Sequence, residues 1–243
     1  MRNRFFLVIL VVFFVFFTKS SMVFASYVTI DNKGALVFDK VLSSETDGKD
    51  ISIKKLQDSP ASSLTDAKVL LNKDNGKLTL NVQSKLGNTT SDVTSFRDNI
   101  VEIEERGDVK KIQIGFSNDK FSISQNGFTV YTSYPIEVDS KEAAVLVHSP
   151  SGVRNLSILP YDAITYVVRS NIISKTAPTV NSLQLSESDK GELFYAIDGV
   201  KGVNLFNVYK FDVPVKTTVS ATNGHVLSVD EPIWYKVFGF VFG

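Results

Sequence analysis

Cysteine is absent from this chain of 243 residues, and histidine occurs only twice, at His148 and His225. Without cysteine the protein has no disulfides, no thiol nucleophile and no cysteine-ligated metal site. The two histidines are isolated, and the sequence has no G-x-S-x-G, H-E-x-x-H, phosphate-loop or dinucleotide-binding motif. We therefore predict that the protein is not an enzyme and has no catalytic residue, cofactor or metal.

An excess of charge of one sign is also missing, since 26 basic residues balance 26 acidic ones. This balance gives no indication of a nucleic-acid partner. Glu102 and Glu104 alternate with apolar residues, which is typical of the solvated face of a strand. Asp31 and Asp47 begin short sequences that resemble the start of a calcium loop, but the glutamate that completes such a loop is missing. Both are interpreted as turns.

The longest apolar run is at the N terminus. Two arginines precede the thirteen apolar residues Phe5–Phe17. This run is shorter than the about 20 residues of a membrane-spanning helix and is typical of a signal peptide. Val23 and Ala25 stand where a cleavage site has small residues. We predict that residues 1–25 are a signal peptide and that the protein is secreted or extracytoplasmic; the alternative is an uncleaved anchor.

Most of the remaining chain alternates apolar and polar residues with a period of two. This pattern predicts a mainly β protein, with a β-rich domain of antiparallel strands over residues 26–174. The clearest hairpin is Lys68–Val82, which contains an Asn-Gly pair at 75–76. A two-residue loop at that pair places Leu71 opposite Leu80 and gathers the apolar side chains on one face.

The same alternation continues between residues 112 and 130 in three runs. Asn118-Asp119 and Asn126-Gly127 separate the runs, which predicts an antiparallel meander. A further strand pair is predicted around residues 149–152.

One segment, at about 160–173, has helical instead of strand periodicity. Its apolar residues recur at spacings of three and four, Pro160 suits a first helical turn, and Asp162 complements a helix N-terminus. We predict one clear α-helix here. The Ser- and Thr-rich segment 175–190 that follows is predicted to be a linker or loop with a short strand at 182–185.

The chain then returns to strand periodicity over residues 191–231. One strand is predicted from Gly191 to Asp198, and a further one in the stretch VNLFNVYKF at 203–211.

A hairpin follows, with its turn at Thr222-Asn223-Gly224. A three-residue loop pairs Val219 with Leu227 and Thr217 with Val229, which sorts the apolar residues onto one face. This loop requires a left-handed backbone at Gly224.

The strands ELFYAID, VPVKTTVSA and HVLSVDE, with the turn TNG, resemble the strand half of a PepSY domain, a module of peptidase propeptides and of many secreted bacterial proteins. The resemblance rests on Tyr195, Val219-Ser220-Ala221, Asn223-Gly224, and Val226-Leu227 with Val229. Ser220 stands where the family usually has an acidic residue. The resemblance implies an α+β unit at 191–231 that binds or inhibits outside the cytoplasm and has no catalytic residue.

An apolar tail, residues 232–243, ends the chain. Its eleven-residue stretch IWYKVFGFVFG is too short to span a bilayer as a helix, and its apolar residues would surround a helix or strand on all sides. The tail either packs on its own domain, lies at a membrane interface, or docks on a partner. The candidate contact residues are Trp234, Tyr235, Phe238, Phe240 and Phe242.

These features predict a non-enzymatic, extracytoplasmic binding or inhibitory module of the bacterial cell envelope. Its expected partner is an unknown protein or the membrane surface. The alternatives are a structural surface protein without a specific ligand and, third, a secreted hydrolase.

Overall fold

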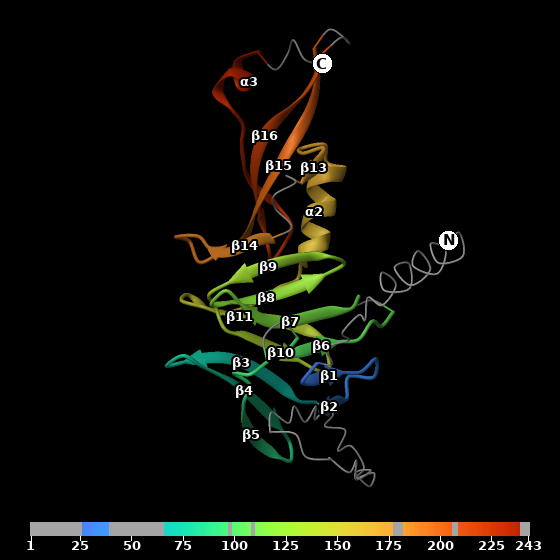
Figure 1. Cartoon of the computed structure of the whole chain (residues 1–243), viewed down its shortest axis with the longest axis vertical. Helices are drawn as coiled ribbons and strands as arrows, with labels where there is room; N and C mark the ends of the chain where they lie inside the picture. Colours follow the sequence, from blue (N-terminus) through green and yellow to red (C-terminus); the bar gives the residue numbers. More distant parts are fainter. Residues whose placement is uncertain are drawn as a thin grey trace, which may run out of the picture.

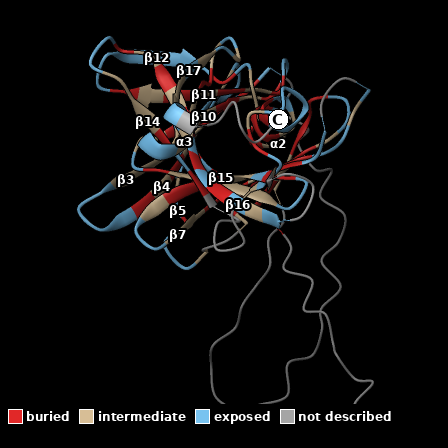
Figure 2. Cartoon of the chain, turned by 90° about the horizontal axis from the view of Figure 1, so that it is seen from above, coloured by how far each residue is buried: buried red, intermediate tan, exposed pale blue. Residues whose placement is uncertain are grey.

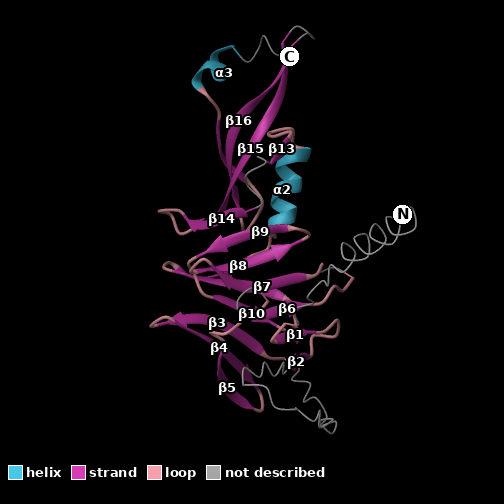
Figure 3. Cartoon of the chain, viewed as in Figure 1, coloured by secondary structure: helices cyan, strands magenta, loops and turns pink. Residues whose placement is uncertain are grey.

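The computed structural model describes residues 26–38, 66–96, 99–107, 110–176, 182–205 and 209–238. Within these ranges the protein is mainly β, as the alternating sequence predicts (Figure 3). The predicted signal peptide and the turn predicted at Asp47 lie outside the described residues.

The larger sheet has eleven strands in the order β17-β16-β15-β14-β9-β8-β7-β6-β1-β2, with β13 pairing β15 (Figure 1). Its strands are β1 (Val28–Ile30), β2 (Leu36–Phe38), β6 (Val101–Ile103), β7 (Ile112–Ser117), β8 (Lys120–Gln125), β9 (Phe128–Thr132), β13 (Lys175–Thr176), β14 (Ser182–Glu187), β15 (Leu193–Leu205), β16 (Tyr209–Ser220) and β17 (Val226–Asp230). The pairs β1–β6 and β9–β14 are parallel, so the sheet is mixed. The prediction of antiparallel strands alone is therefore wrong for this sheet.

The smaller sheet has six strands in the order β12-β11-β10-β3-β4-β5. They are β3 (Lys68–Asp74), β4 (Lys77–Ser84), β5 (Gly87–Asp92), β10 (Ile136–Asp139), β11 (Ala144–Ser149) and β12 (Gly152–Asn155). All its pairs are antiparallel.

The hairpin β3–β4 has the register that its Asn-Gly turn predicts. Leu71 pairs with Leu80, and the backbone is left-handed at both Asn75 (φ 48°) and Gly76 (φ 80°). The predicted meander β7–β8–β9 and the predicted pair β11–β12 are confirmed as well.

The apolar faces of the two sheets form one hydrophobic core. Ile123, Val130 and Leu183 follow one another across β8, β9 and β14, and each is almost fully buried. Leu71 and Leu80 of the smaller sheet belong to the same core. Figure 2 shows the buried parts of the strands in red. The opposite face of the larger sheet therefore carries the polar side chains of these strands.

Helix α2 (Pro160–Arg169) packs on the same apolar face, against β8, β9 and β15. It ends four residues before the predicted boundary, because Asn171 adopts a left-handed conformation (φ 55°) and turns the chain. Ile173 then lies fully buried. At the N-terminal end the buried side chain of Gln125 accepts a hydrogen bond from the backbone N–H of Tyr161 at 3.2 Å.

The segment expected as a linker or loop contains β13 and β14. Strand β14 covers the predicted short strand at 182–185 and continues to Glu187. It pairs with β9 on one side and β15 on the other, so it continues the larger sheet between these strands.

Strands β15 and β16 form a long hairpin that extends past the rest of the larger sheet beside α2 (Figure 1). Its register runs from Phe194 opposite Ser220 to Leu205 opposite Tyr209. The separate strand predicted at 203–211 is therefore wrong: residues 203–205 are the end of β15 and residues 209–211 the start of β16, while 206–208 lie outside the described residues. Alternation continues unbroken through both strands, so the pattern does not reveal where the chain reverses.

The turn between β16 and β17 is partly as predicted. Thr217 pairs with Val229, and Gly224 is left-handed with φ 76°. The predicted pair of Val219 with Leu227 is wrong, because Val219 pairs with Val226 and the register shifts next to it. The resulting bulge leaves Leu227 exposed.

A second helix, α3 (Ile233–Phe238), follows β17, where the sequence predicts only an apolar tail. Among the described residues, no helix has the length and apolar character that crossing a membrane requires.

Candidate interaction surface at the outer end of the C-terminal hairpin

The described part of the tail, residues 232–238, runs back along the C-terminal hairpin. After β17 the chain turns at Pro232, whose carbonyl oxygen accepts hydrogen bonds from the N–H groups of Tyr235 (2.9 Å) and Lys236 (3.1 Å). These bonds begin the single short helix α3. Because β17 runs antiparallel to β16, the chain beyond it runs toward the outer end of the hairpin.

Aromatic contacts hold α3 to this end. The Trp234 ring lies 6.0 Å from the ring of Phe211 on β16, centroid to centroid, and 5.7 Å from the ring of Tyr235. The Lys201 ammonium on β15 lies 5.8 Å from the centroid of Tyr235. Such geometry is that of favourable aromatic and cation–π pairs.

Apolar side chains remain exposed around these contacts. Ile233 is 80 % exposed, Trp234 43 %, Val237 56 % and Tyr209 68 %. Tyr209 lies on the same face of β16 as Phe211, two residues nearer the end of the hairpin. We call these four residues the hairpin-end surface. Exposed apolar groups gathered at one place are typical of an interaction site.

Basic residues accompany the hairpin-end surface. Lys210 and Lys236 are exposed, and Lys201 is half-buried. Asp212 on the same strand as Lys210 is paired with Lys175 at 2.9 Å. The ammonium group of Lys201 and the α3 residue Lys236 lie beside the apolar cluster, whereas Lys210 points to the opposite face of β16 from Tyr209 and Phe211, at the same end of the hairpin.

The predicted contact residues fall partly within this surface. Trp234, Tyr235 and Phe238 are in α3, whereas Phe240 and Phe242 lie outside the described residues. Sequence reasoning missed Phe211 and Tyr209, which the alternation of YKFDV places on one strand face. Their closeness to α3 depends on the tail turning back at Pro232.

The two histidines have ordinary structural surroundings. His148 Nε2 lies 2.8 Å from Glu137 Oε2 on the outer face of the smaller sheet, and Lys68 reaches Glu137 Oε1 at 3.2 Å. Ser149 is adjacent to His148 in the strand, so its hydroxyl points to the opposite face, where it donates to Glu187 at 2.6 Å. His148 and Ser149 therefore cannot act as a base and nucleophile pair.

His225 is exposed beside the turn at Gly224. The described residues contain no group of three or more His, Cys, Asp or Glu side chains suited to hold a metal ion. Asp31 makes a turn, as predicted: its Oδ1 accepts from the N–H groups of Lys33 (2.8 Å) and Ala35 (2.7 Å).

Glu102 differs from the freely solvated residue that its alternation predicts. It is half-buried on β6, where it accepts hydrogen bonds from Ser26 (3.2 Å) and Gln113 (3.1 Å) and pairs with Lys111 (2.8 Å). Burial alone would raise the pKa of Glu102, but these donors and the Lys111 charge outweigh it and lower that pKa below its ordinary value. Glu104 is exposed, as expected.

Tyr195, one of the residues in the PepSY resemblance, is fully buried on β15. Its hydroxyl donates to the carbonyl of Ile158 at 2.6 Å and so fixes the segment that leads into α2. Burial, with a smaller contribution from the charge of Asp162, raises the pKa of Tyr195 well above its ordinary value. The Tyr195 side chain therefore stabilises the fold through this hydrogen bond.

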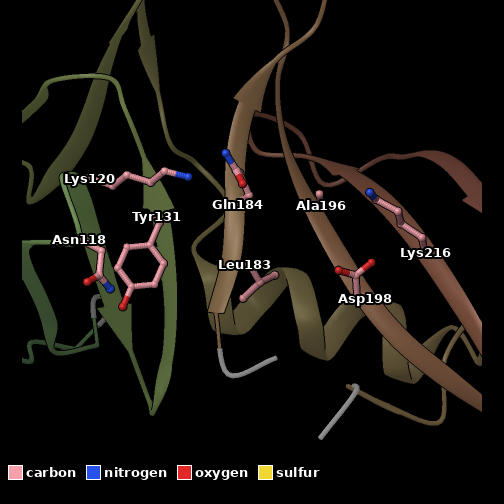
Figure 4. A pocket seen from close by; sticks show the side chains of 8 residues that line it. All are labelled: Asn118, Lys120, Tyr131, Leu183, Gln184, Ala196, Asp198 and Lys216. Carbon is pink, nitrogen blue, oxygen red and sulfur yellow. The ribbon is translucent and has the colours of Figure 1, made fainter. Parts of the chain in front are cut away.

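A second candidate lies on the polar face of the larger sheet. A hollow of about 600 Å³ lies over β8, β9, β14, β15 and β16 and is shown in Figure 4. It is lined by Asn118, Lys120, Tyr131, Leu183, Gln184, Ala196, Asp198 and Lys216. No motif in the sequence identifies it, since its eight members come from five strands and a turn.

No family model, curated protein or solved structure matches this chain.

Proposed function

We propose that this protein is a non-enzymatic, extracytoplasmic binding module of the bacterial cell envelope, which contacts an anionic membrane surface through the hairpin-end surface. One observation carries the proposal: exposed apolar side chains and ammonium groups occur together at the outer end of the longest hairpin. The C-terminal strands at 191–231 would then form a PepSY-like unit, as the sequence resemblance implies.

The chemistry of the hairpin-end surface suits a lipid headgroup region. Trp234 and Tyr209 combine an apolar ring with a polar group, which is the character of residues at membrane–water interfaces. Ile233 and Val237 would enter the acyl boundary. Lys210 and Lys236 would approach anionic headgroups, each contributing about 1 kcal/mol near a charged bilayer surface.

The binding expected from this surface is reversible. Full burial of a side chain such as Ile or Val is worth about 1.5–3 kcal/mol, and ordering the protein at the surface opposes part of that gain. A few such side chains produce adsorption, whereas permanent anchoring needs a spanning helix or more than one lipid chain.

The position of the surface agrees with such a role. Strands β15 and β16 pair over twelve residues, which at about 3.4 Å per residue makes the hairpin roughly 40 Å long. Adsorption through its outer end would leave the smaller sheet and the rest of the larger sheet away from the bilayer and accessible to other envelope components (Figure 1).

The test uses the form that an expressing bacterium exports, with its N terminus sequenced to check the predicted cleavage after Ala25. We expect it to co-sediment with vesicles of phosphatidylcholine and phosphatidylglycerol. Ile233→Ser and Val237→Ser together should abolish co-sedimentation. Leu86→Ser is the matched control, since Leu86 is 84 % exposed in the turn between β4 and β5.

Unchanged co-sedimentation in the double variant would show that the hairpin-end surface does not bind lipid. Failure of the exported protein to sediment, with capture of an envelope protein that the double variant loses, would assign the surface to a protein partner and contradict the membrane proposal.

A further inference from the structure

The polar face of the larger sheet carries one continuous row of side chains across five strands. Residues directly opposite one another in successive pairs are Tyr131, Gln184, Ala196, Thr218 and Ser228. Cross-strand neighbours on one face of a sheet point in the same direction. The small Ala196 side chain in the middle of this row leaves the hollow between larger neighbours (Figure 4).

The polar groups on this face fall into two classes. Around β6 and β7 they bond to one another: Glu102 accepts from Gln113 and Ser26. The same holds for Ser124 of β8 with Thr129 of β9, and for Thr218 of β16 with Ser228 of β17, which lie in hydrogen-bond contact at 2.8 Å. These side chains are hydrogen-bonded within the protein and stabilise the pairing of neighbouring strands.

In the hollow the polar groups are different. The side chains that line it and have no hydrogen-bond or ion-pair partner among the described residues include Lys120, Tyr131, Gln184, Asp198 and Lys216. They retain their donors and acceptors for a ligand, which can bind them without breaking any contact within the described fold.

The charges of the hollow are separated across it. Lys120 is on β8 and Lys216 on β16, four strand spacings apart, which corresponds to roughly 19 Å. Asp198 lies opposite Lys216 in the β15–β16 register. With two ammonium groups and one carboxylate, the lining favours a ligand that is elongated and anionic.

We propose that this hollow binds a glycan chain that carries carboxylate or phosphate groups. The chain would lie across the strands, from Lys120 over Tyr131 and Gln184 toward Lys216. Sugar rings present apolar C–H faces that pack on an aromatic ring, here Tyr131, while their hydroxyls exchange hydrogen bonds with an amide such as Gln184 and a carboxylate such as Asp198. The anionic groups would meet the two lysines.

The shape and polarity of the hollow favour a glycan over a lipid or an apolar peptide. It is an open surface depression with polar groups along its length, and its aromatic residue, Tyr131, is half-buried. An apolar ligand would leave those polar groups desolvated without partners, which costs free energy. This site is separate from the hairpin-end surface and shares no residue with it.

The experiment titrates the exported protein with hexagalacturonate, an anionic oligosaccharide, and with neutral maltohexaose, by isothermal calorimetry. We expect hexagalacturonate to bind, with an affinity that falls as sodium chloride is added, and maltohexaose to bind at least about tenfold more weakly. Tyr131→Ala and Gln184→Ala should each weaken hexagalacturonate binding, Tyr131→Ala by about tenfold.

Two matched controls separate the hollow from the general surface. Tyr166→Ala removes a tyrosine that is 49 % exposed on α2, and Gln83→Ala removes an exposed strand glutamine from the smaller sheet. Neither should change the affinity. Absence of hexagalacturonate binding, equal binding of both oligosaccharides, or equal losses in the controls would each overturn the proposal.

The outcome is independent of the membrane proposal. Ile233→Ser with Val237→Ser should leave hexagalacturonate binding unchanged, and Tyr131→Ala should leave vesicle binding unchanged. Either proposal can therefore be contradicted while the other still holds.

Discussion

Phe211 on β16 and Trp234 on α3 lie with their ring centroids 6.0 Å apart, although 22 residues and the whole of β17 separate them in the chain. This contact places the last described helix on the outer end of the C-terminal hairpin. The fluorescence of Trp234 reports on this contact, since Trp234 is the single tryptophan of the chain.

Phe211→Ala should remove the ring partner of Trp234 on β16, while its other ring neighbour, Tyr235, stays in place. We expect the emission maximum of Trp234 to shift to longer wavelength, because a tryptophan that loses packing becomes more hydrated. Fluorescence spectroscopy measures the shift directly. Phe194→Ala is the control, since Phe194 is a half-buried residue at the other end of β15. An unshifted emission in Phe211→Ala would contradict the placement of α3.

Gly199→Ala should destabilise the protein by about 1–3 kcal/mol, the range for overpacking a core. A Cβ at Gly199 would lie 2.7 Å from Ile173 Cδ1 and Cγ2, and Ile173 is fully buried. Denaturant unfolding measures the change. Gly202→Ala on the same strand is the control, because a Cβ there meets nothing closer than 3.6 Å.

Gly199→Ala should cost less in an Ile173→Ala background than in the original protein, because the two Ile173 atoms nearest to the added Cβ are then absent. Equal stability of Gly199→Ala and the original protein would show that the segment after α2 does not pack on β15.

Gly224→Val should also destabilise the protein by about 1–3 kcal/mol, because its φ of 76° strains a β-branched residue. Gly224→Asn should cost less, since asparagine tolerates the left-handed region better than other side chains. Thermal unfolding compares the three proteins. Melting temperatures that are equal for valine and glycine would place the turn elsewhere.

Glu102→Gln should change the pH dependence of stability. The folded state lowers the pKa of Glu102, so its charged form stabilises the fold above the ordinary value of 4.5, and this contribution is lost as the pH falls through the lower folded-state value. The difference in melting temperature between the original protein and Glu102→Gln should therefore be largest near neutral pH and shrink below about pH 4.5.

Glu104→Gln serves as the control for this series. Glu104 is exposed two residues away, so its substitution should change the melting temperature little. A constant difference for Glu102→Gln from neutral to acid pH would contradict the stabilising role of the Glu102 charge.

Local chemistry made much of the fold predictable. The hairpin at Asn75-Gly76 has its predicted register because only Gly, Asn and Asp adopt left-handed turns easily, and because one face of each strand must be buried. The start of α2 at Pro160 follows from the same kind of local preference.

Features that depend on distant pairing could not be predicted. Alternation does not tell which strands become neighbours, so the parallel pairing of β14 with β9 is invisible in the sequence. The bulge that exposes Leu227 adds one residue to β17, and the apolar pattern fits the register with or without it.

The two candidate surfaces were predictable to different degrees. Trp234 and Tyr235 are conspicuous because they belong to an apolar run at the end of the chain. Tyr131, Gln184 and Asp198 are unremarkable in sequence, and only the register of three strands brings them into one hollow.

The most direct test of the membrane proposal is the emission of Trp234 during titration with vesicles. With vesicles of phosphatidylcholine and phosphatidylglycerol we expect a saturable shift to shorter wavelength, which phosphatidylcholine alone produces weakly and which added salt reduces. Ile233→Ser with Val237→Ser should remove the shift, and Leu86→Ser should retain it. An emission spectrum of Trp234 that stays unchanged at saturating anionic vesicles would contradict membrane contact through the hairpin-end surface.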